Sequence, residues 1–127
     1  MPIVKIDLKK GKTIEFHKTF MDSVHASMVE VLQLPADDRN IRLTEFDPAY
    51  IQSKPPYEYF IEIIMFAGRT KETKAKLYRS IVSKLKEALQ IAPTHVFIVI
   101  NEQPKENWGI RGGVSAADIK FDFNVNI

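Results

Sequence analysis

The sequence matches itself when it is shifted by 57 residues, and this internal repeat limits the folds open to the chain more than any other feature. The match runs without a gap from Gly11 to Glu45, which fall on Gly68 and Glu102. The other identical pairs are Thr13 and Thr70, Glu15 and Glu72, Ser23 and Ser80, Glu30 and Glu87, Leu32 and Leu89, Gln33 and Gln90, and Ile41 and Ile98. A fixed offset of this kind indicates that one supersecondary unit is duplicated.

The first unit has the pattern of a strand, a helix and a second strand. Residues 3–8 and 41–46 are apolar enough to form the strands, and Gly11 provides a turn. Thr13 is suited to cap a helix that runs to about residue 33, because proline at position 35 disfavours helix in the residue before it. Apolar residues recur at helical spacing along it: Phe20, Val24, Met28 and Leu32.

The second unit repeats this order. We predict a strand at residues 59–66, a turn at Gly68, a helix that begins near Lys71 and a strand at residues 96–100. The linker 47–57 holds three of the prolines and is typical of an exposed loop. Beyond the repeat, the glycine-rich segment 108–113 predicts a hairpin or tight loop, and the alternation in residues 119–123 predicts a short edge strand.

Two such units in tandem predict an α+β fold with the order β-α-β-β-α-β. Right-handed crossovers place both helices on one face of a four-stranded sheet. The segments 59–66 and 96–100 are apolar nearly throughout, which is typical of strands buried on both faces. We therefore expect the other face of the sheet to lie at an oligomer interface. We expect one domain, 1–127, with repeat units 2–46 and 59–103 and a C-terminal hairpin at 107–124.

Composition excludes several classes of function. The chain has no cysteine, and His17, His25 and His95 lack the spacing of metal ligands, so we expect no metal and no disulfide. A net charge of +2 is too small to indicate a nucleic-acid partner. No apolar run is long enough to span a membrane, and the N-terminus lacks the pattern of a signal peptide. These features favour a cytoplasmic protein without a membrane or nucleic-acid partner.

Pro2 would carry a free secondary amine if Met1 were removed. An α-amino group has a pKa of about 7.7–8.0, and burial or a nearby cation lowers it. Such an amine is neutral at cellular pH and is suited to act as a general base. The alternative is that Pro2 simply begins a strand, where its missing N–H is tolerated.

A duplicated β-α-β unit that begins at Pro2 resembles the tautomerase superfamily over nearly the whole chain. In the second half, residues 66–74 (FAGRTKETK) and 108–113 (WGIRGG) are similar to 4-oxalocrotonate tautomerase. In the first half, residues 35–39 (PADDR) and 22–25 (DSVH) are similar to malonate semialdehyde decarboxylase. Ala67 stands where the decarboxylase pattern has the first of two arginines, which weakens that part of the resemblance.

The resemblance implies roles for six residues and no cofactor. Pro2 would be the catalytic acid or base, and Arg69 would bind a substrate carboxylate and lower the pKa of the amine. Asp38 would activate water or orient the substrate. Trp108 and Ile110 would form an apolar wall over the amine, and Arg111 would bind a second carboxylate. The alternatives are a surface arginine at 69, a loop aspartate at 38, core packing for Trp108 and a solvated arginine at 111.

The function implied is keto–enol tautomerisation of a phenylpyruvate-like 2-oxo acid by a homo-oligomer, a trimer by resemblance. One alternative is decarboxylation or hydration of a small 3-oxo or unsaturated acid, with a charged Pro2 as acid and Asp38 activating water. A second is a non-enzymatic oligomeric binding protein, if Met1 is retained.

Overall fold

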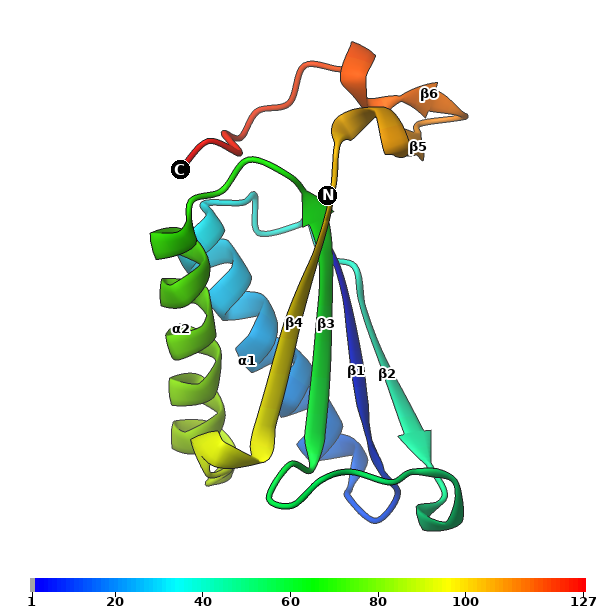
Figure 1. Cartoon of the computed structure of the whole chain (residues 1–127), viewed down its shortest axis with the longest axis vertical. Coiled ribbons are helices and arrows are strands. Elements are labelled where there is room, and N and C mark those ends of the chain that lie inside the picture. The colour runs from blue at the N-terminus through cyan, green and yellow to red at the C-terminus, as the bar shows by residue number, and fades with distance from the viewer. Residues whose placement is uncertain (1) are drawn as a thin grey trace.

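In the computed structural model, which describes residues 2–127, each half of the repeat folds into a strand–helix–strand unit (Figure 1). The first unit consists of β1 (Ile3–Lys9), α1 (Ile14–Leu32) and β2 (Ile41–Phe46). The second consists of β3 (Tyr59–Phe66), α2 (Lys71–Leu89) and β4 (Val96–Gln103). A small hairpin of β5 (Gly109–Ile110) and β6 (Val114–Ser115) follows. The predicted α+β class is confirmed.

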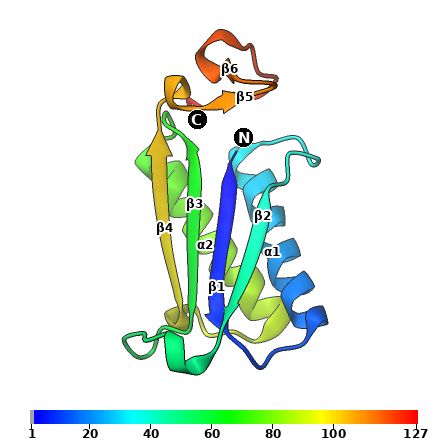
Figure 2. The same cartoon turned by 90° about the vertical axis from the view of Figure 1, so that its right-hand side faces the viewer.

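The strands form one mixed sheet in the order β2-β1-β3-β4. Within each unit the strands are parallel, and β1 pairs with β3 in antiparallel fashion. The register repeats with the sequence offset, since Val4 faces Ile41 and Ile61 faces Ile98. Both helices cover the same face of the sheet, as the crossover rule requires (Figure 2).

The turns and caps repeat as closely as the strands. Thr13 and Thr70 cap the two helices, and their hydroxyl oxygens accept from the backbone N–H of Phe16 at 3.1 Å and of Thr73 at 3.2 Å. Each helix ends at a glutamine in the left-handed region, Gln33 and Gln90, both with φ 55°. Each unit is followed by a short 3₁₀ turn, Pro48–Tyr50 and Lys105–Asn107. The duplication is therefore preserved in backbone geometry.

The helices bury the core against one face of the sheet and leave the other face open. Phe20, Ile61, Leu77 and Ile81 are fully buried in this core. On the open face, which lies toward the viewer in Figure 2, Phe60 is 36%, Phe97 43% and Val99 37% exposed. The apolar strands are therefore buried on one side only within a single chain.

The segment predicted as an edge strand at 119–123 is irregular, so that prediction was wrong. The rings of Phe121 and Phe123 lie 5.2 and 6.4 Å from the ring of Phe66, and all three join a second, smaller core with Ala116 and Val125. Burial of these rings against Phe66 accounts for the path of the chain, and the segment pairs with no strand among the described residues 2–127. The hairpin itself is formed by β5 and β6 alone.

The two repeat glycines allow a matched test of this C-terminal packing. Gly11 and Gly68 have φ of 129° and 138°, a region that strains any other residue by about 1–3 kcal/mol. A Cβ on Gly68 would lie 3.0 Å from the backbone oxygen of Val125, whereas a Cβ on Gly11 would meet nothing within 4 Å. Urea unfolding should therefore show a loss of stability for both Gly11→Ala and Gly68→Ala, with the larger loss for Gly68→Ala. Equal losses would mean that the tail does not pack against this turn.

Candidate active site

The topology brings five separate segments to one end of the sheet. Pro2 is buried and precedes β1, and the pairing of Ile3 with Ile64 places it beside the end of β3. The N–H of Val4 donates to the carbonyl of Asn40 at 2.8 Å, so the loop between α1 and β2 lies on the other side of β1. The end of β4 and the hairpin complete this end, where the chain begins in Figure 2.

Arg69 is the charged side chain with the most unusual environment at this end. It is only 5% exposed, and its Nη1 donates to the carbonyl oxygen of Phe66 at 3.3 Å. Its Nε and Nη2 are also buried and have no hydrogen-bond partner within residues 2–127. Burial lowers the pKa of Arg69, and the nearby carboxylates of Glu102 and Asp38 oppose that shift. A buried guanidinium with two free N–H positions is suited to bind a carboxylate.

An ion pair beside Arg69 was missed by the sequence interpretation. The ammonium of Lys74 contacts the carboxylate of Glu102, and both side chains are about a quarter exposed. The internal repeat could have indicated this pair. The 57-residue offset relates Lys74 to His17 and Glu102 to Glu45, and the side chains of His17 and Glu45 lie 3.6 Å apart. Glu102 is thus held by Lys74 and also stabilises the charged form of Arg69.

Asp38 and Arg111 lie together on one cavity of about 350 Å³. The amide of Asn40 donates to Asp38 Oδ1 at 3.5 Å, and the Asp38 carboxylate stabilises charged Arg69. Arg111 has a φ of 52°, and its guanidinium lies 5.6 Å from the ring centre of Phe121. The lining of the cavity also includes Asp37, Asp122 and Arg39, so it holds both carboxylates and cations.

Trp108 and Ile110 lie at this end but pack against Phe66 in the second core. The rings of Trp108 and Phe66 meet edge to face at 4.9 Å. The indole N–H of Trp108 is buried and has no hydrogen-bond partner within the described part of the chain. The indole ring of Trp108 thus covers Phe66 at the end of β3, just before the turn that contains Arg69.

Two polar residues near the site have structural partners instead. Arg39 Nη2 lies 2.6 Å from Asp22 Oδ1, so these two side chains form an ion pair. His25 is 9% exposed, and its Nε2 lies 2.8 Å from the carbonyl oxygen of Ala36, so the ring has a backbone partner. Within residues 2–127, no cluster of three or more acidic or histidine side chains could hold a metal ion.

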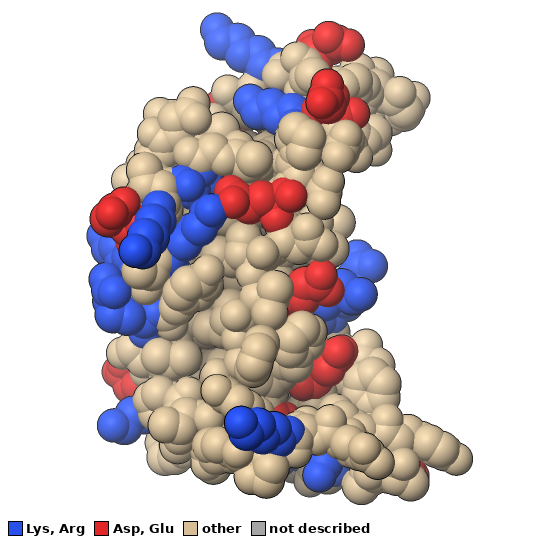
Figure 3. Space-filling model, viewed as in Figure 1, with Lys and Arg blue, Asp and Glu red and all other residues tan. Residues whose placement is uncertain are grey.

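Basic side chains gather over α2, the helix that begins directly after Arg69 (Figure 3). The lysines and the arginine of this helix are Lys71, Lys74, Lys76, Arg79, Lys84 and Lys86. A concentration of positive charge near a binding site favours the approach of anions. The end of the sheet therefore combines a buried Pro2, a buried cation and the basic side chains at the start of α2, which together suit a small organic anion.

Comparison with known proteins assigns this arrangement to a family. Residues 46–111 match the family model described as tautomerase enzyme. The chain is 32% identical over 121 residues to the probable tautomerase YusQ of Bacillus subtilis (strain 168), which covers 89% of this chain and 95% of that protein. The chain belongs to the tautomerase superfamily, a family of enzymes.

Solved structures share the fold over most of the chain. The FG41 malonate semialdehyde decarboxylase inhibited by 3-bromopropiolate is 31% identical, with a TM-score of 0.81 over 89% of this chain and 92% of that one. An asymmetric trimer of fused 4-OT is 24% identical, with a TM-score of 0.81 over 91% of this chain and 96% of that one. Within the described residues, neither helix is both long and apolar enough to cross a membrane.

Proposed function

We propose that this enzyme interconverts the keto and enol forms of a small 2-oxo acid with an apolar, phenylpyruvate-like group, and that the amine of Pro2 moves the proton. The observation that carries this proposal is Arg69, a buried cation with two nitrogens that have no hydrogen-bond partner within residues 2–127, at the end of the sheet where Pro2 precedes β1. Leaving buried N–H groups of a charged side chain without hydrogen bonds is costly, so such an arrangement favours a ligand that accepts from them. A carboxylate fits the planar fork of the guanidinium.

The amine would act in its neutral form. It would take a proton from the carbon next to the substrate carbonyl, and the ammonium so formed would return that proton to the enolate oxygen, which gives the enol and the neutral amine again. Burial of Pro2 and the positive charge of Arg69 both favour the neutral amine. Arg69 would also stabilise the negative charge that develops in the transition state. The proposal requires removal of Met1, which lies outside the described residues.

A decarboxylase or hydratase is the second candidate, and one specific observation favours it. Asp38 lines a cavity with Arg111 and interacts electrostatically with Arg69, which is where a water-activating carboxylate would be needed. The similarity to the FG41 decarboxylase supports the same reading. In this mechanism Pro2 would be charged and would donate a proton. Ala67, in place of an arginine, counts against it.

The pH dependence of the reaction separates the two candidates. If neutral Pro2 is the base, kcat/KM for the ketonisation of phenylenolpyruvate should rise with pH through the pKa of the amine and then level off. The absorbance of the enol provides the assay, and direct titration of the Pro2 nitrogen by NMR identifies the group. A resting amine that stays charged well above pH 8 would contradict the tautomerase proposal and favour the charged-acid mechanism.

We further propose that the enzyme is a homotrimer whose subunits meet at the open face of the sheet. The exposed apolar side chains of Phe60, Phe97 and Val99 support this, since patches of this kind mark contacts between proteins. The trimeric fused 4-OT, which shares the fold, supports the same assembly.

One substitution on each face tests the assembly. Val99→Asp places a charge on the open face proposed as the interface and should release monomers, because an unpaired charge is costly to bury. Ile14, which is 68% exposed at the start of α1, provides the control, and Ile14→Asp should leave the assembly intact. Light scattering after size exclusion measures the mass. A wild-type mass of one chain, or a Val99→Asp protein that stays trimeric, would contradict this interface.

A further inference from the structure

We propose that the open face of the sheet is a heterologous interface, in which Arg42 of one subunit forms an ion pair with Glu62 of the next subunit. This inference rests on the homotrimer proposed above and adds the charge pair that orients its subunits. A closed ring of three identical chains joins two different surfaces at every contact, whereas a twofold dimer joins one surface to itself. The two halves of the open face should therefore differ from each other and be complementary.

The alternation of side chains along a strand decides which of them lie on the open face. Arg42, Lys5 and Glu62 each lie between two apolar residues that belong to the core or pack against it, namely Ile41 and Leu43, Val4 and Ile6, and Ile61 and Ile63. All three charged side chains therefore point to the open face. The pairing register places them in one row across the sheet, in the order Arg42, Lys5, Glu62 and Val99.

This row shows that the two halves of the face no longer match. The 57-residue offset relates Lys5 to Glu62, and the register pairs these two residues directly, so they flank the twofold axis between the two units. An exact duplicate would have the same residue at both positions, but here Lys5 Nζ lies 3.9 Å from Glu62 Oε1. The same offset relates Arg42 to Val99. One half of the row therefore carries two cations, and the other half carries a carboxylate and a valine.

The cationic half of the row lacks an anion for Arg42. This side chain is exposed, and it forms no ion pair within residues 2–127. Its register partner on β1 is Lys5, so two cations lie side by side on paired strands. Like charges in such positions repel each other. A carboxylate from a neighbouring subunit would relieve this repulsion.

The middle of the face has the opposite need, because two carboxylates share one lysine. Lys5 lies beside Glu62, and its charge also acts on Asp7. Burial raises the pKa of Asp7, Lys5 opposes this shift, and Glu62 adds to it. A second cation, supplied by a neighbouring subunit, would balance the two carboxylates when the face is covered.

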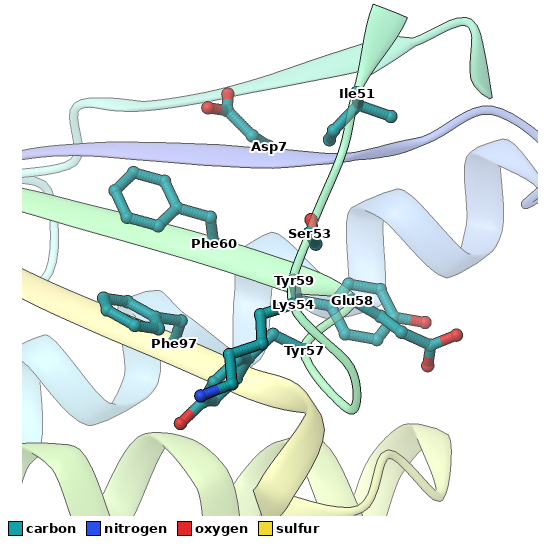
Figure 4. A pocket seen from close by; sticks show the side chains of 9 residues that line it. All are labelled: Asp7, Ile51, Ser53, Lys54, Tyr57, Glu58, Tyr59, Phe60 and Phe97. Carbon is teal, nitrogen blue, oxygen red and sulfur yellow. The ribbon is translucent and has the colours of Figure 1, made fainter. Parts of the chain in front are cut away.

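The surface next to Glu62 suits an arginine in particular. Asp7, Phe60 and Phe97 form the adjacent row of the sheet, and all three line a cavity of about 250 Å³ (Figure 4). The ring centres of Phe60 and Phe97 lie 5.9 Å apart, and the lining of the cavity holds two carboxylates and one lysine. A guanidinium binds carboxylates and stacks on aromatic rings, and arginine is enriched in protein interfaces for this reason.

The order of the strands brings the two partners together in a ring. The edges of the sheet are β2 and β4. When three sheets turn their open faces toward a common axis along the strands, the β2 edge of one subunit meets the β4 edge of the next. Residues of the same row then lie at the same level, so Arg42 on β2 approaches Val99 on β4 and Glu62 on the strand beside it.

Charge reversal at the two positions tests this pairing. Arg42→Glu and Glu62→Arg each place like charges at every contact. Each should raise the protein concentration at which the assembly half dissociates by about tenfold or more, the scale of one close charge pair in an interface. Arg42→Gln, which removes the charge without adding repulsion, should have a smaller effect. The double variant with both reversals should assemble more tightly than either single variant, as measured by light scattering after size exclusion.

Mixing the two single variants shows whether the pair joins two chains. A contact between an Arg42→Glu chain and a Glu62→Arg chain has opposite charges in either order, so two of the three contacts in a mixed ring are complementary. The mixture should therefore assemble at a concentration at which each variant alone is monomeric. Mixing cannot restore an ion pair that lies within one chain.

Arg79→Glu and Glu72→Arg are the matched controls, because both residues are exposed on α2, on the opposite side of the sheet. Neither substitution should change the assembly, and circular dichroism checks that every variant is folded.

Two results would overturn the pairing and leave the trimer intact. One is a trimer that both reversals at positions 42 and 62 leave as stable as wild type. The other is rescue by the double variant without rescue by mixing, which would assign the pair to a single chain. A wild-type mass of one chain would instead contradict the trimer itself, and the pairing with it.

Discussion

Replacing Pro2 with alanine should lower the turnover of phenylenolpyruvate by about 10²–10⁴-fold, the usual contribution of a general acid or base. Alanine retains a free primary amine after removal of Met1, so the change is not a loss of charge. It removes the secondary amine and the ring that restricts its rotation, and it leaves a more mobile, better hydrated base. Steady-state kinetics with enzyme of verified intact mass provides the measurement.

Intact mass is also the control that decides how this result is interpreted. If Met1 is still attached, the Pro2 nitrogen is a tertiary amide and has no basic lone pair. A mature protein that keeps Met1 and lacks activity would favour the binding-protein alternative. A wild-type protein that keeps Met1 and is active, or a Pro2→Ala protein with unchanged turnover, would show that Pro2 is not the base.

Arg69→Gln should have the second largest effect, a loss of about 10²–10³-fold in kcat/KM, as expected for removal of one group that stabilises developing negative charge. The same substitution should leave the free energy of unfolding unchanged or raise it. Arg69 is buried, and its Nε and Nη2 have no hydrogen-bond partner within residues 2–127, so its removal relieves two unsatisfied buried N–H groups. Kinetics and urea unfolding of the same variant measure both effects.

Arg79→Gln is the matched control, because Arg79 is an exposed arginine on α2 and lies outside the site. It should change neither kinetics nor stability by more than a small amount. The opposite outcome for Arg69→Gln, a large loss of stability with activity retained, would assign Arg69 a structural role.

Local signals in the sequence were enough to place most of the fold. The bounds of β2 and β3 agree with the predicted strands, and Thr13, Thr70, Gly11 and Gly68 mark the turns and caps as expected. These features depend on backbone geometry within a few residues, which local sequence determines. The duplication then set the topology, because two tandem right-handed units have few ways to share a sheet.

The segment 119–123 shows where local pattern failed. Its alternation is that of a strand, but Phe121 and Phe123 pack on Phe66, more than fifty residues earlier in the chain. Which apolar surface lies nearby depends on the path of the whole chain. Alternation alone therefore could not separate a paired strand from an irregular segment with buried rings.

By itself, the sequence determined the repeat, the elements and the residue types that the chemistry needs, because these depend on neighbours along the chain. Only the tertiary structure decided that Arg69 is buried without a full set of partners, that Lys74 and Glu102 flank it, and that Asp38 shares a cavity with Arg111. It also decided that the opposite end has a cavity of its own. Burial, charge environment and cavity shape result from contacts between distant segments, and the β1–β3 pairing that creates both ends is such a contact.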